Sequence, residues 1–359
     1  MARPRRILLA QTSFLGDVIL TTPLARRLRQ GFPESEVWWL VRPDAVPLVA
    51  PLAGSERVIA FDKRGADAGL PGTVALSRRL RAQGFDVAIG VQRSLRTALL
   101  LALARIPLRI GFAGSPGAWL YHRRVPKSGA HARDRLLALA APLGLASDPA
   151  PAPELAVDPA TARAIEEQLR AGGVAATDRI AVVAPGSAWA TKRWPATHFA
   201  DAARELLPSR VDRVVVIGGA GDGELAATIA SRLPTGTVVD LTGRTDLAGM
   251  VAVVARATVV LANDSGPAHA AGALGVPVVA VFGPTVPEQG FSPLGPAVRV
   301  VGRALGCRPC SRHGGAVCPI GTHECMLDLA PRVVVEAAAD LLPGSASGRG
   351  SAVGGGQGA

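Results

Sequence analysis

Short apolar runs alternate with longer helix-like segments along almost the whole chain, and this restricts the fold more than any other feature. The first series of apolar runs covers residues 5–10, 36–41, 58–61 and 86–91, with helical periodicity at 17–31, 72–84 and 133–143. The second series covers residues 179–185, 213–219, 237–243, 257–264 and 276–284. Such alternation is typical of parallel βαβ units. We therefore expect an α/β protein with two Rossmann-like halves.

A change in composition separates the two series. The stretch "LASDPAPAPELAVDPA", residues 145–160, is rich in Pro and Ala and favours a linker over regular structure. A chain of 359 residues is long enough for two domains, each with its own core. The predicted organisation is a first domain at 1–150, a linker with a connecting helix at 151–175, a second domain at 176–343 and a disordered Gly/Ser-rich tail at 344–359.

The charge balance indicates an anionic partner. The 39 basic and 28 acidic residues give a net charge of +11, which suits nucleic acid, a phosphorylated small molecule or an acidic membrane surface. The basic residues are dispersed, without a basic tail or interleaved aromatic residues, which argues against nucleic acid. Polar residues interrupt the apolar amino-terminal stretch, and no run of 18 apolar residues exists, so we expect a cytoplasmic, soluble or peripheral protein.

In open parallel sheets, ligands bind beyond the carboxyl ends of the strands. The stretch "QTSFLGDVILTTP" follows the first predicted strand, and it places Gly16 and Asp17 at the start of a helix. Asp17 is either an ordinary first-turn aspartate or a general base that faces the cleft.

The corresponding stretch of the second half is "APGSAWATKRWP". Ser187 follows the strand directly, as a residue of a phosphate-binding turn does. Lys192 is one of only three lysines among the 39 basic residues, so a compact point charge is favoured here over a solvated surface lysine.

A third stretch, "LANDSGPAHAAGALGVPVVAVFGPT", links two predicted strands of the second half. Ser265 suits a helix N-cap, the N–H groups of 265–268 suit a diphosphate, and Asp264 suits sugar hydroxyls. His269 is either a ligand contact or a packed core histidine. The glycine-rich "VVVIGGAGDGE" places Asp222 within reach of a ribose, which is a weak signal.

These motifs together resemble glycosyltransferase family 9, the ADP-heptose:lipopolysaccharide heptosyltransferases, and most of all their heptosyltransferase II branch. The resemblance runs from about residue 5 to 340 and implies a GT-B fold, in which two Rossmann-like domains face each other. It implies inverting, metal-independent transfer of L-glycero-D-manno-heptose from ADP-heptose to an anionic lipopolysaccharide inner-core acceptor at the inner-membrane surface.

The resemblance also assigns roles to residues. Asp17 matches the general base, and Lys192 matches the lysine that contacts the donor diphosphate. The donor site further includes these matched or nearby residues: Ser187, Asp222 (ribose), Thr245 (adenine pocket), Asp264, Ser265, Gly266 and His269. An arginine-rich segment near 78–124 is expected to face the acceptor or the membrane, through Arg93, Arg96, Arg109, Arg123 and Arg124.

All four cysteines, Cys307, Cys310, Cys318 and Cys325, fall in one segment with the spacing C-x2-C-x7-C-x6-C. With His313 and His323 inside it, the segment offers enough ligands for a structural zinc. Reduced thiols in a folded loop and disulfides are the alternatives. Because this segment is far in sequence from the other motifs, we expect no catalytic role for it.

Three other functions share some of these sequence features. A family 9 transferase with another acceptor, such as a protein or a different surface glycan, has the same motifs. A nucleotide-binding module without catalysis has no need of Asp17. A dehydrogenase is disfavoured because neither half carries G-x-G-x-x-G at its first strand exit.

Overall fold

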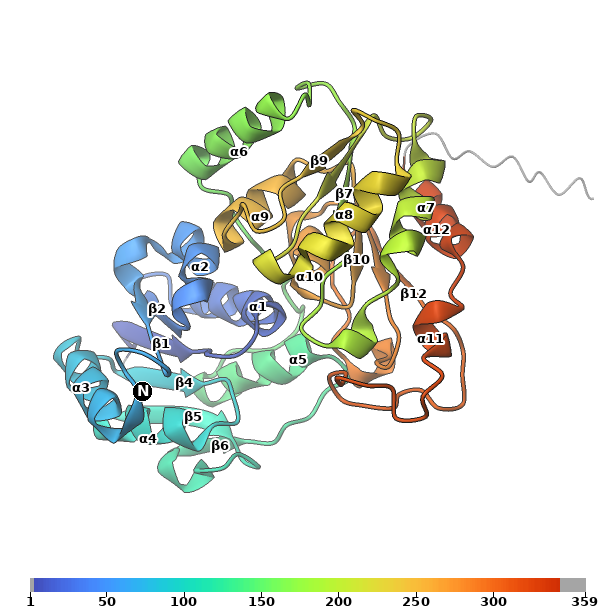
Figure 1. Ribbon diagram of the computed structural model, residues 1–359. Helices are drawn as coiled ribbons and strands as arrows, with labels where there is room; N and C mark the ends of the chain where they lie inside the picture. The colour runs from blue at the N-terminus through green and yellow to red at the C-terminus, as the bar shows by residue number, and fades with distance from the viewer. Residues whose placement is uncertain (1–2, 343–359) are drawn as a thin grey trace, which may run out of the picture.

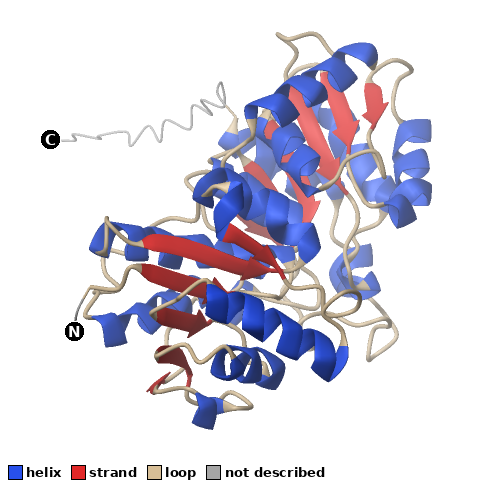
Figure 2. Cartoon of the chain, turned by 90° about the vertical axis from the view of Figure 1, so that its left-hand side faces the viewer, coloured by secondary structure: helices blue, strands red, loops and turns tan. Residues whose placement is uncertain are grey.

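The computed structural model describes residues 3–342, which form two six-stranded, all-parallel sheets (Figures 1 and 2). The first sheet has the order β3-β2-β1-β4-β5-β6 and contains β1 (Arg6–Ala10), β2 (Glu36–Val41), β3 (Val58–Ala60), β4 (Val87–Gly90), β5 (Leu108–Phe112) and β6 (Arg123–Val125). The second has the order β12-β11-β10-β7-β8-β9 and contains β7 (Ile180–Ala184), β8 (Arg213–Val216), β9 (Val238–Asp240), β10 (Val259–Asn263), β11 (Val278–Val281) and β12 (Val298–Val301). Both orders are the Rossmann order, so ligand crevices are expected between β1 and β4 and between β7 and β10.

Helices flank both sheets (Figure 2). The α-helices are α1 (Leu15–Gly31), α2 (Val46–Ala53), α3 (Gly69–Ala82), α4 (Leu95–Leu103), α5 (Ala132–Leu137), α6 (Pro159–Ala171), α7 (Ala196–Leu206), α8 (Gly223–Arg232), α9 (Leu247–Ala255), α10 (Gly266–Leu274), α11 (Glu324–Leu327) and α12 (Pro331–Leu341). Short 3₁₀ helices are η1 (Pro43–Ala45), η2 (Ser55–Arg57), η3 (Ala118–Leu120), η4 (Ala138–Leu143), η5 (Ala190–Lys192), η6 (Ala220–Asp222) and η7 (Pro287–Gln289).

The predicted strands are all present, but the sequence did not reveal β5, β6 and β12. Strands β6 and β12 lie at sheet edges and are partly exposed, so they lack the continuous apolar run of a central strand. Strand β5 carries Arg109 between its apolar residues. The predicted helix at 133–143 is divided into α5 and η4.

Each half has a buried hydrophobic cluster of its own, as expected of two domains, but a third and larger cluster runs from one half into the other. The largest cluster of buried side chains includes Ile7 of β1 and Val18 of α1 as well as Val260 of β10 and Ala268 of α10. Figure 1 shows α1 and α10 side by side at the boundary between the blue and the orange halves. The two halves therefore share buried contacts near the starts of these helices.

The linker has no helix or strand between residues 145 and 158, as its composition predicts. It is nevertheless anchored to α1, because the backbone N–H of Glu154 donates to Thr22 Oγ1 at 2.9 Å and its carboxylate pairs with Arg29. The connecting helix α6 then begins at Pro159, and its N-cap residue Asp158 accepts through its side chain from the N–H of Thr161. The predicted disordered tail at 344–359 lies outside the described residues.

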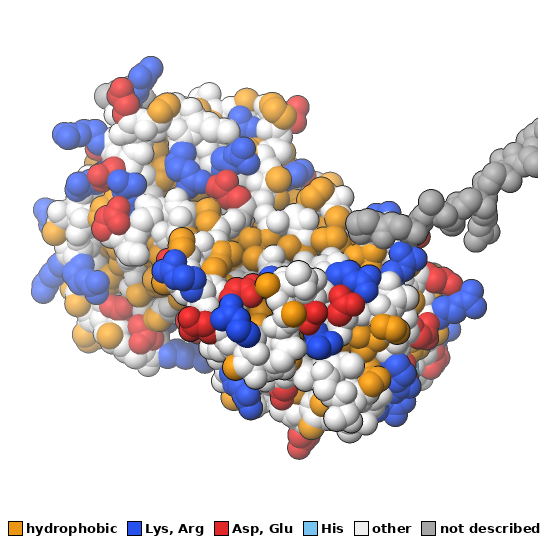
Figure 3. Space-filling model, turned by 90° about the horizontal axis from the view of Figure 1, so that it is seen from above, with side chains coloured by type: hydrophobic (Ala, Val, Ile, Leu, Met, Phe, Trp, Pro, Cys, Tyr) orange, Lys and Arg blue, Asp and Glu red, His pale blue; other side chains and the backbone are white. Residues whose placement is uncertain are grey.

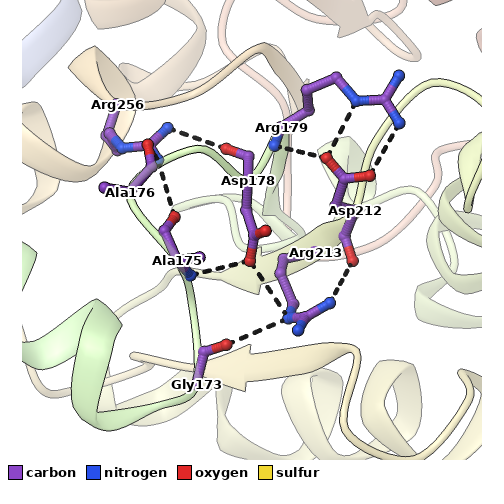
Figure 4. Close-up of polar contacts among 8 residues, drawn as sticks. All are labelled: Gly173, Ala175, Ala176, Asp178, Arg179, Asp212, Arg213 and Arg256. Atoms are coloured by element: carbon purple, nitrogen blue, oxygen red, sulfur yellow. Dashed lines mark hydrogen bonds and ion pairs between the residues drawn. The ribbon is translucent and has the colours of Figure 1, made fainter.

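A polar cluster holds together the starts of β7 and β8, at the sheet edge opposite their carboxyl ends (Figure 4). Arg179 donates two side-chain hydrogen bonds to Asp212, at 3.0 and 2.8 Å, and its backbone N–H donates a third at 2.8 Å. These bonds lower the pKa of Asp212 to about 2. Asp178 pairs with Arg213 at 3.6 Å beside it. The cluster stabilises the starts of β7 and β8, and it lies away from their carboxyl ends, where a ligand is expected.

The distribution of charged side chains over the surface agrees with the dispersed basic residues of the sequence. Figure 3 shows basic and acidic side chains interspersed over one face, without a large patch of one sign. Within residues 3–342, none of the helices combines the length and the hydropathy that a membrane span requires.

Candidate active site

Asp17 lies in the first turn of α1, just beyond the end of β1. Ser13 Oγ donates to Asp17 Oδ2 at 2.6 Å, which orients the carboxylate. The hydroxyl of Thr21 donates to the backbone carbonyl of Asp17 at 2.7 Å, and Gln11 Nε2 donates to that hydroxyl at 3.0 Å. The loop after β1 therefore presents a half-buried, oriented carboxylate.

The starts of α1 and α10 fit into each other through two glycines. A Cβ atom at Gly16 would lie 2.8 Å from His269 Cδ2, and one at Gly266 would lie 2.2 Å from Leu15 Cδ2. Each glycine thus receives a side chain from the other half. As a result, Asp17 and the start of α10 belong to one packed unit.

We expect Gly16→Ala to lower the free energy of unfolding by about 1–3 kcal/mol, the usual cost of overpacking. The added methyl group requires His269 or the facing helix to move. Urea denaturation measures this, with Gly306→Ala as the control because a Cβ there meets nothing within 4 Å. Equal stability of the two variants would contradict the interlocked packing.

Lys192 and Asp264 form a buried ion pair on the other side of the crevice. The distance from Lys192 Nζ to Asp264 Oδ2 is 2.5 Å, and the side chains are only 12% and 8% exposed. Thr285 Oγ1 also donates to Asp264 Oδ2, at 2.7 Å. The structure thus gives Asp264 two protein partners, where the sequence predicted only sugar hydroxyls.

Asn263, the last residue of β10, joins the two strand exits of the second half. Its Nδ2 donates to the carbonyl of Pro185 at 2.7 Å, and its Oδ1 accepts from the N–H of Trp194 at 3.0 Å. The side chain is fully buried. This amide fixes the loop that carries Ser187 and Lys192 relative to Asp264, and the sequence analysis did not identify it.

Ser265 is the N-cap residue of α10, as predicted, but its side chain does not cap the helix. Its hydroxyl donates to the carbonyl of Asn263 at 3.1 Å instead. Within residues 3–342, no side chain accepts from the N–H groups of Gly266 and Ala268 in the first turn of α10, so these two groups are available to an anion, whereas Pro267 between them has no N–H group.

One cavity of about 300 Å³ joins these residues across the two halves. Of the predicted site residues, it is lined by Asp17, Ser187, Lys192, Asp264, Ser265 and His269. Gly266 supports the helix contact and does not line it.

Asp222 and Thr245 also lie outside the lining. Asp222 Oδ2 accepts from the N–H of Gly219 at 2.9 Å and lies against Gly186. Thr245 packs against Gly249 at the start of α9. Their ribose and adenine roles stay predictions.

His269 is buried and also lines the cavity. It therefore has the packing of a core histidine and the position of a ligand contact, the two interpretations that the sequence left open. Burial lowers its pKa to about 4, although the nearby Asp264 and Asp17 act in the opposite direction and Lys192 in the same one. The ring is therefore neutral at pH 7. Within the described residues, its Nδ1 has no hydrogen-bond partner.

This lowered pKa predicts a loss of stability in acid. Between the unfolded value of 6.5 and the folded value of about 4, the unfolded chain binds more protons at His269, so stability falls as the pH falls through this window. We expect His269→Gln to remove this contribution, on the order of 3 kcal/mol between pH 7 and pH 4. Urea midpoints at both pH values measure it. An unchanged pH dependence would contradict a buried, neutral ring.

The cysteine segment packs directly against this site, although it is far from the other motifs in the sequence. A Cβ atom at Gly314 would lie 2.9 Å from Lys192 Cδ, and Gly315 N–H donates to Thr191 Oγ1 at 2.8 Å. His323 Nε2 lies 2.8 Å from the carbonyl of Thr191. Arg312 and His313 line the cavity itself. The sequence feature that could have indicated this close packing is the pair Gly314 and Gly315, which follows these two residues.

The four cysteines are free thiols, so the disulfide alternative finds no support. Burial raises the pKa of Cys310 and Cys325, whereas hydrogen bonds from backbone N–H groups lower that of Cys318. Across residues 3–342, no three His, Cys, Asp or Glu side chains are arranged to hold a metal ion. The suggested structural zinc has no support from the geometry.

A second cavity, of about 710 Å³, adjoins the first and also reaches Asp17. Its wall includes residues of both halves, among them Gln92 and Arg93 after β4, Lys127 after β6 and Gln289 of η7. Ser13, Asp17, Gln289, Phe291, Arg312 and His313 line both cavities. Asp17 thus lies in the wall of both cavities.

The arginines near 78–124 have different positions. Arg93 lines the larger cavity, and Arg123 and Arg124 are exposed on the edge strand β6. Arg96 instead donates to the carbonyls of Lys63, Asp67 and Gly69, and Arg109 to those of Leu120 and Ile106. Arg96 and Arg109 therefore stabilise loops, which weakens their predicted role toward the acceptor.

Comparison with known proteins agrees with the motifs. The model of the family "Glycosyltransferase family 9 (heptosyltransferase)" matches residues 73–319. The lipooligosaccharide heptosyltransferase 2 of Haemophilus influenzae is 28% identical over 354 residues, which cover 94% of this chain and 99% of the relative. The structure of the E. coli ADP-heptose lps heptosyltransferase II is 25% identical, with a TM-score of 0.76 and coverage of 94% and 98%. A family 9 structure from Veillonella parvula is 24% identical, with a TM-score of 0.83 and coverage of 94% and 97%. The expected resemblance and the GT-B fold are confirmed.

Proposed function

Since the chain belongs to glycosyltransferase family 9, we propose that it transfers L-glycero-D-manno-heptose from ADP-heptose to heptosyl-Kdo-lipid A, with inversion, in lipopolysaccharide core synthesis. The chain is a glycosyltransferase by its family and by its nearly full-length likeness to heptosyltransferases. The observation that supports the proposal most directly is the shared cavity. Asp17 from the first half and Lys192, Asp264 and Ser265 from the second half line it together.

Asp17 is proposed as the general base. It would take the proton of the acceptor hydroxyl while that oxygen attacks the anomeric carbon of the heptose. The hydrogen bond from Ser13 engages Oδ2, so the carboxylate is already oriented for this transfer. Asp17 and Lys192 approach the cavity from different halves, which suits attack on one face of the sugar and departure from the other.

The second half is proposed to bind ADP-heptose. Lys192 would stabilise the negative charge that develops on the departing ADP, together with the uncapped start of α10. An ammonium group has three donors, so Lys192 can keep its bond to Asp264 while it contacts a phosphate oxygen. Ser187 lies in the same cavity and is proposed as a further phosphate contact. No step of this reaction uses a metal ion.

The proposal is tested by incubating the purified protein with ADP-heptose and heptosyl-Kdo-lipid A. Mass spectrometry of the product should show one added heptose, and NMR should show the inverted anomeric configuration. A protein acceptor and a different surface glycan serve as parallel substrates. Transfer to either of these without transfer to the lipid acceptor would overturn the proposed acceptor, and retained anomeric configuration would overturn inversion.

A further inference from the structure

Four cationic side chains surround the larger cavity, and they come from both halves of the protein. Arg93, Lys127 and Arg135 belong to the first half, and Arg312 belongs to the cysteine segment of the second. The acidic residues of the same wall are Asp17 and Glu288. The positive charges thus outnumber the negative ones around a cavity that contains the proposed base.

The cations are close enough to influence one another. Burial lowers the pKa of Lys127, and Arg135, Arg93 and Arg312 lower it further, whereas Asp17 acts in the opposite direction. Charges on several different elements therefore act on the ammonium group of Lys127. Uncompensated positive charges at close range repel each other, and a bound anion removes that repulsion.

The four cations differ in how they are held. Arg135 donates to the carbonyls of Gly129 and Ala130, at 2.8 Å each, and Arg93 donates to the carbonyl of Gly114. In contrast, within residues 3–342 the side chains of Lys127 and Arg312 form no hydrogen bond or ion pair. Their donors are available to a ligand.

The backbone around Arg312 is held in place, although its side chain is exposed. Gln289 Nε2 donates to the carbonyl of Ser311 at 2.9 Å, and Ser311 Oγ accepts from the N–H of Gly314 at 2.6 Å. Gly315 is bonded to Thr191 beside Lys192. The second half therefore holds the backbone of a residue whose guanidinium group lines both cavities.

We propose that Arg312, together with Lys127, binds a carboxylate or phosphate group of the acceptor next to the hydroxyl that Asp17 deprotonates. This inference rests on the proposed function and makes the second half contribute to acceptor recognition. A guanidinium group binds a planar carboxylate or a phosphate through two parallel hydrogen bonds, whereas a lysine supplies only a point charge. The acceptor heptosyl-Kdo-lipid A carries both kinds of anion.

The test compares Arg312→Gln, Arg312→Lys and Lys127→Gln with the unchanged protein. The matched control is Arg303→Gln, because Arg303 lies just before the cysteine segment, pairs with Asp328 and lines neither of the two cavities. We expect Arg312→Gln to raise the acceptor KM by about 10–100-fold, the range for a lost charge-assisted hydrogen bond, with an unchanged Kd for ADP. Arg312→Lys should recover only part of the loss, and Arg303→Gln should behave as the unchanged protein.

Modified acceptors identify the anion. One acceptor has its phosphates removed by a phosphatase, and another has its carboxylates reduced to alcohols. The unchanged protein should bind one of them at least as weakly as Arg312→Gln binds the intact acceptor. Arg312→Gln should distinguish that acceptor from the intact one less than the unchanged protein does, because only Lys127 still contacts the anion. A variant that has only lost local structure would distinguish them as strongly as the unchanged protein does.

Two results would overturn the inference. One is an unchanged acceptor KM in Arg312→Gln, and the other is a loss of ADP binding that accounts for the whole effect. Acceptor binding is also measured directly, by calorimetry without a donor. If the unchanged protein transfers no heptose, the proposed function is wrong, and equal acceptor binding by the unchanged protein and Arg312→Gln would still reject the role of Arg312.

Discussion

Asp17→Asn is expected to lower kcat by at least about 100-fold, the low end of what a general base contributes. An amide has nearly the same size as the carboxylate but cannot take the proton of the acceptor hydroxyl. The hydrogen bond from Ser13 Oγ to position 17 can be kept, because the amide oxygen accepts as the carboxylate does. Single-turnover transfer measures the loss, and calorimetry with ADP should give an unchanged Kd.

The control for this variant is Asp44→Asn. Asp44 also lies at the start of a short helix of the first half, but it pairs with Arg42 at the surface. We expect its kcat to stay within about twofold of the unchanged protein, since surface ion pairs contribute little. A similar kcat in Asp17→Asn and Asp44→Asn would exclude Asp17 as the base.

Lys192→Met is expected to lower both activity and stability. The loss of a donor that stabilises developing charge typically lowers kcat about 10²–10³-fold. In addition, the substitution leaves Asp264 unpaired although its side chain is only 8% exposed, and breaking a buried pair in this way costs about 3–5 kcal/mol. Transfer assays measure the first effect and urea denaturation measures the second.

A double substitution separates these two effects. Lys192→Met combined with Asp264→Asn removes both charges, so we expect it to be more stable than Lys192→Met alone while it stays inactive. Arg332→Ala is the control, because its ion pair with Glu336 is exposed and should contribute less than about 1 kcal/mol. If the double variant recovered transfer, Lys192 would serve only to neutralise Asp264.

Much of the fold could be predicted from the sequence, because central parallel strands are buried on both faces and appear as continuous apolar runs. Strands β1 and β10 are examples. The edge strands β6 and β12 could not be recognised in this way, since they are partly exposed. The shared core was also missed, because helix periodicity shows that α1 and α10 have apolar faces but does not show that these faces meet.

Of the predicted site residues, Asp17, Ser187 and Asp264 lie in one cavity, and each belongs to a stretch that directly follows a strand. Topology places Ser187 and Asp264 at the carboxyl ends of the second sheet and Asp17 at those of the first. Arg312 and His313 were missed because the segment that carries them follows the last strand and reaches the cavity only through tertiary contacts with Thr191 and Gln289. The pairing of Lys192 with Asp264 was missed because it is a tertiary contact between loops that follow two different strands.

The continuous core has a consequence for engineering. A chimera that replaced the first 150 residues with those of a relative would exchange Gly16 and Leu15, which pack against His269 and Gly266 of the second half. A graft meant to change acceptor preference should therefore carry α10 and its flanking loops along with the amino-terminal half. A junction in the linker lies in a segment without helix or strand, but the buried contacts between the two halves still cross it.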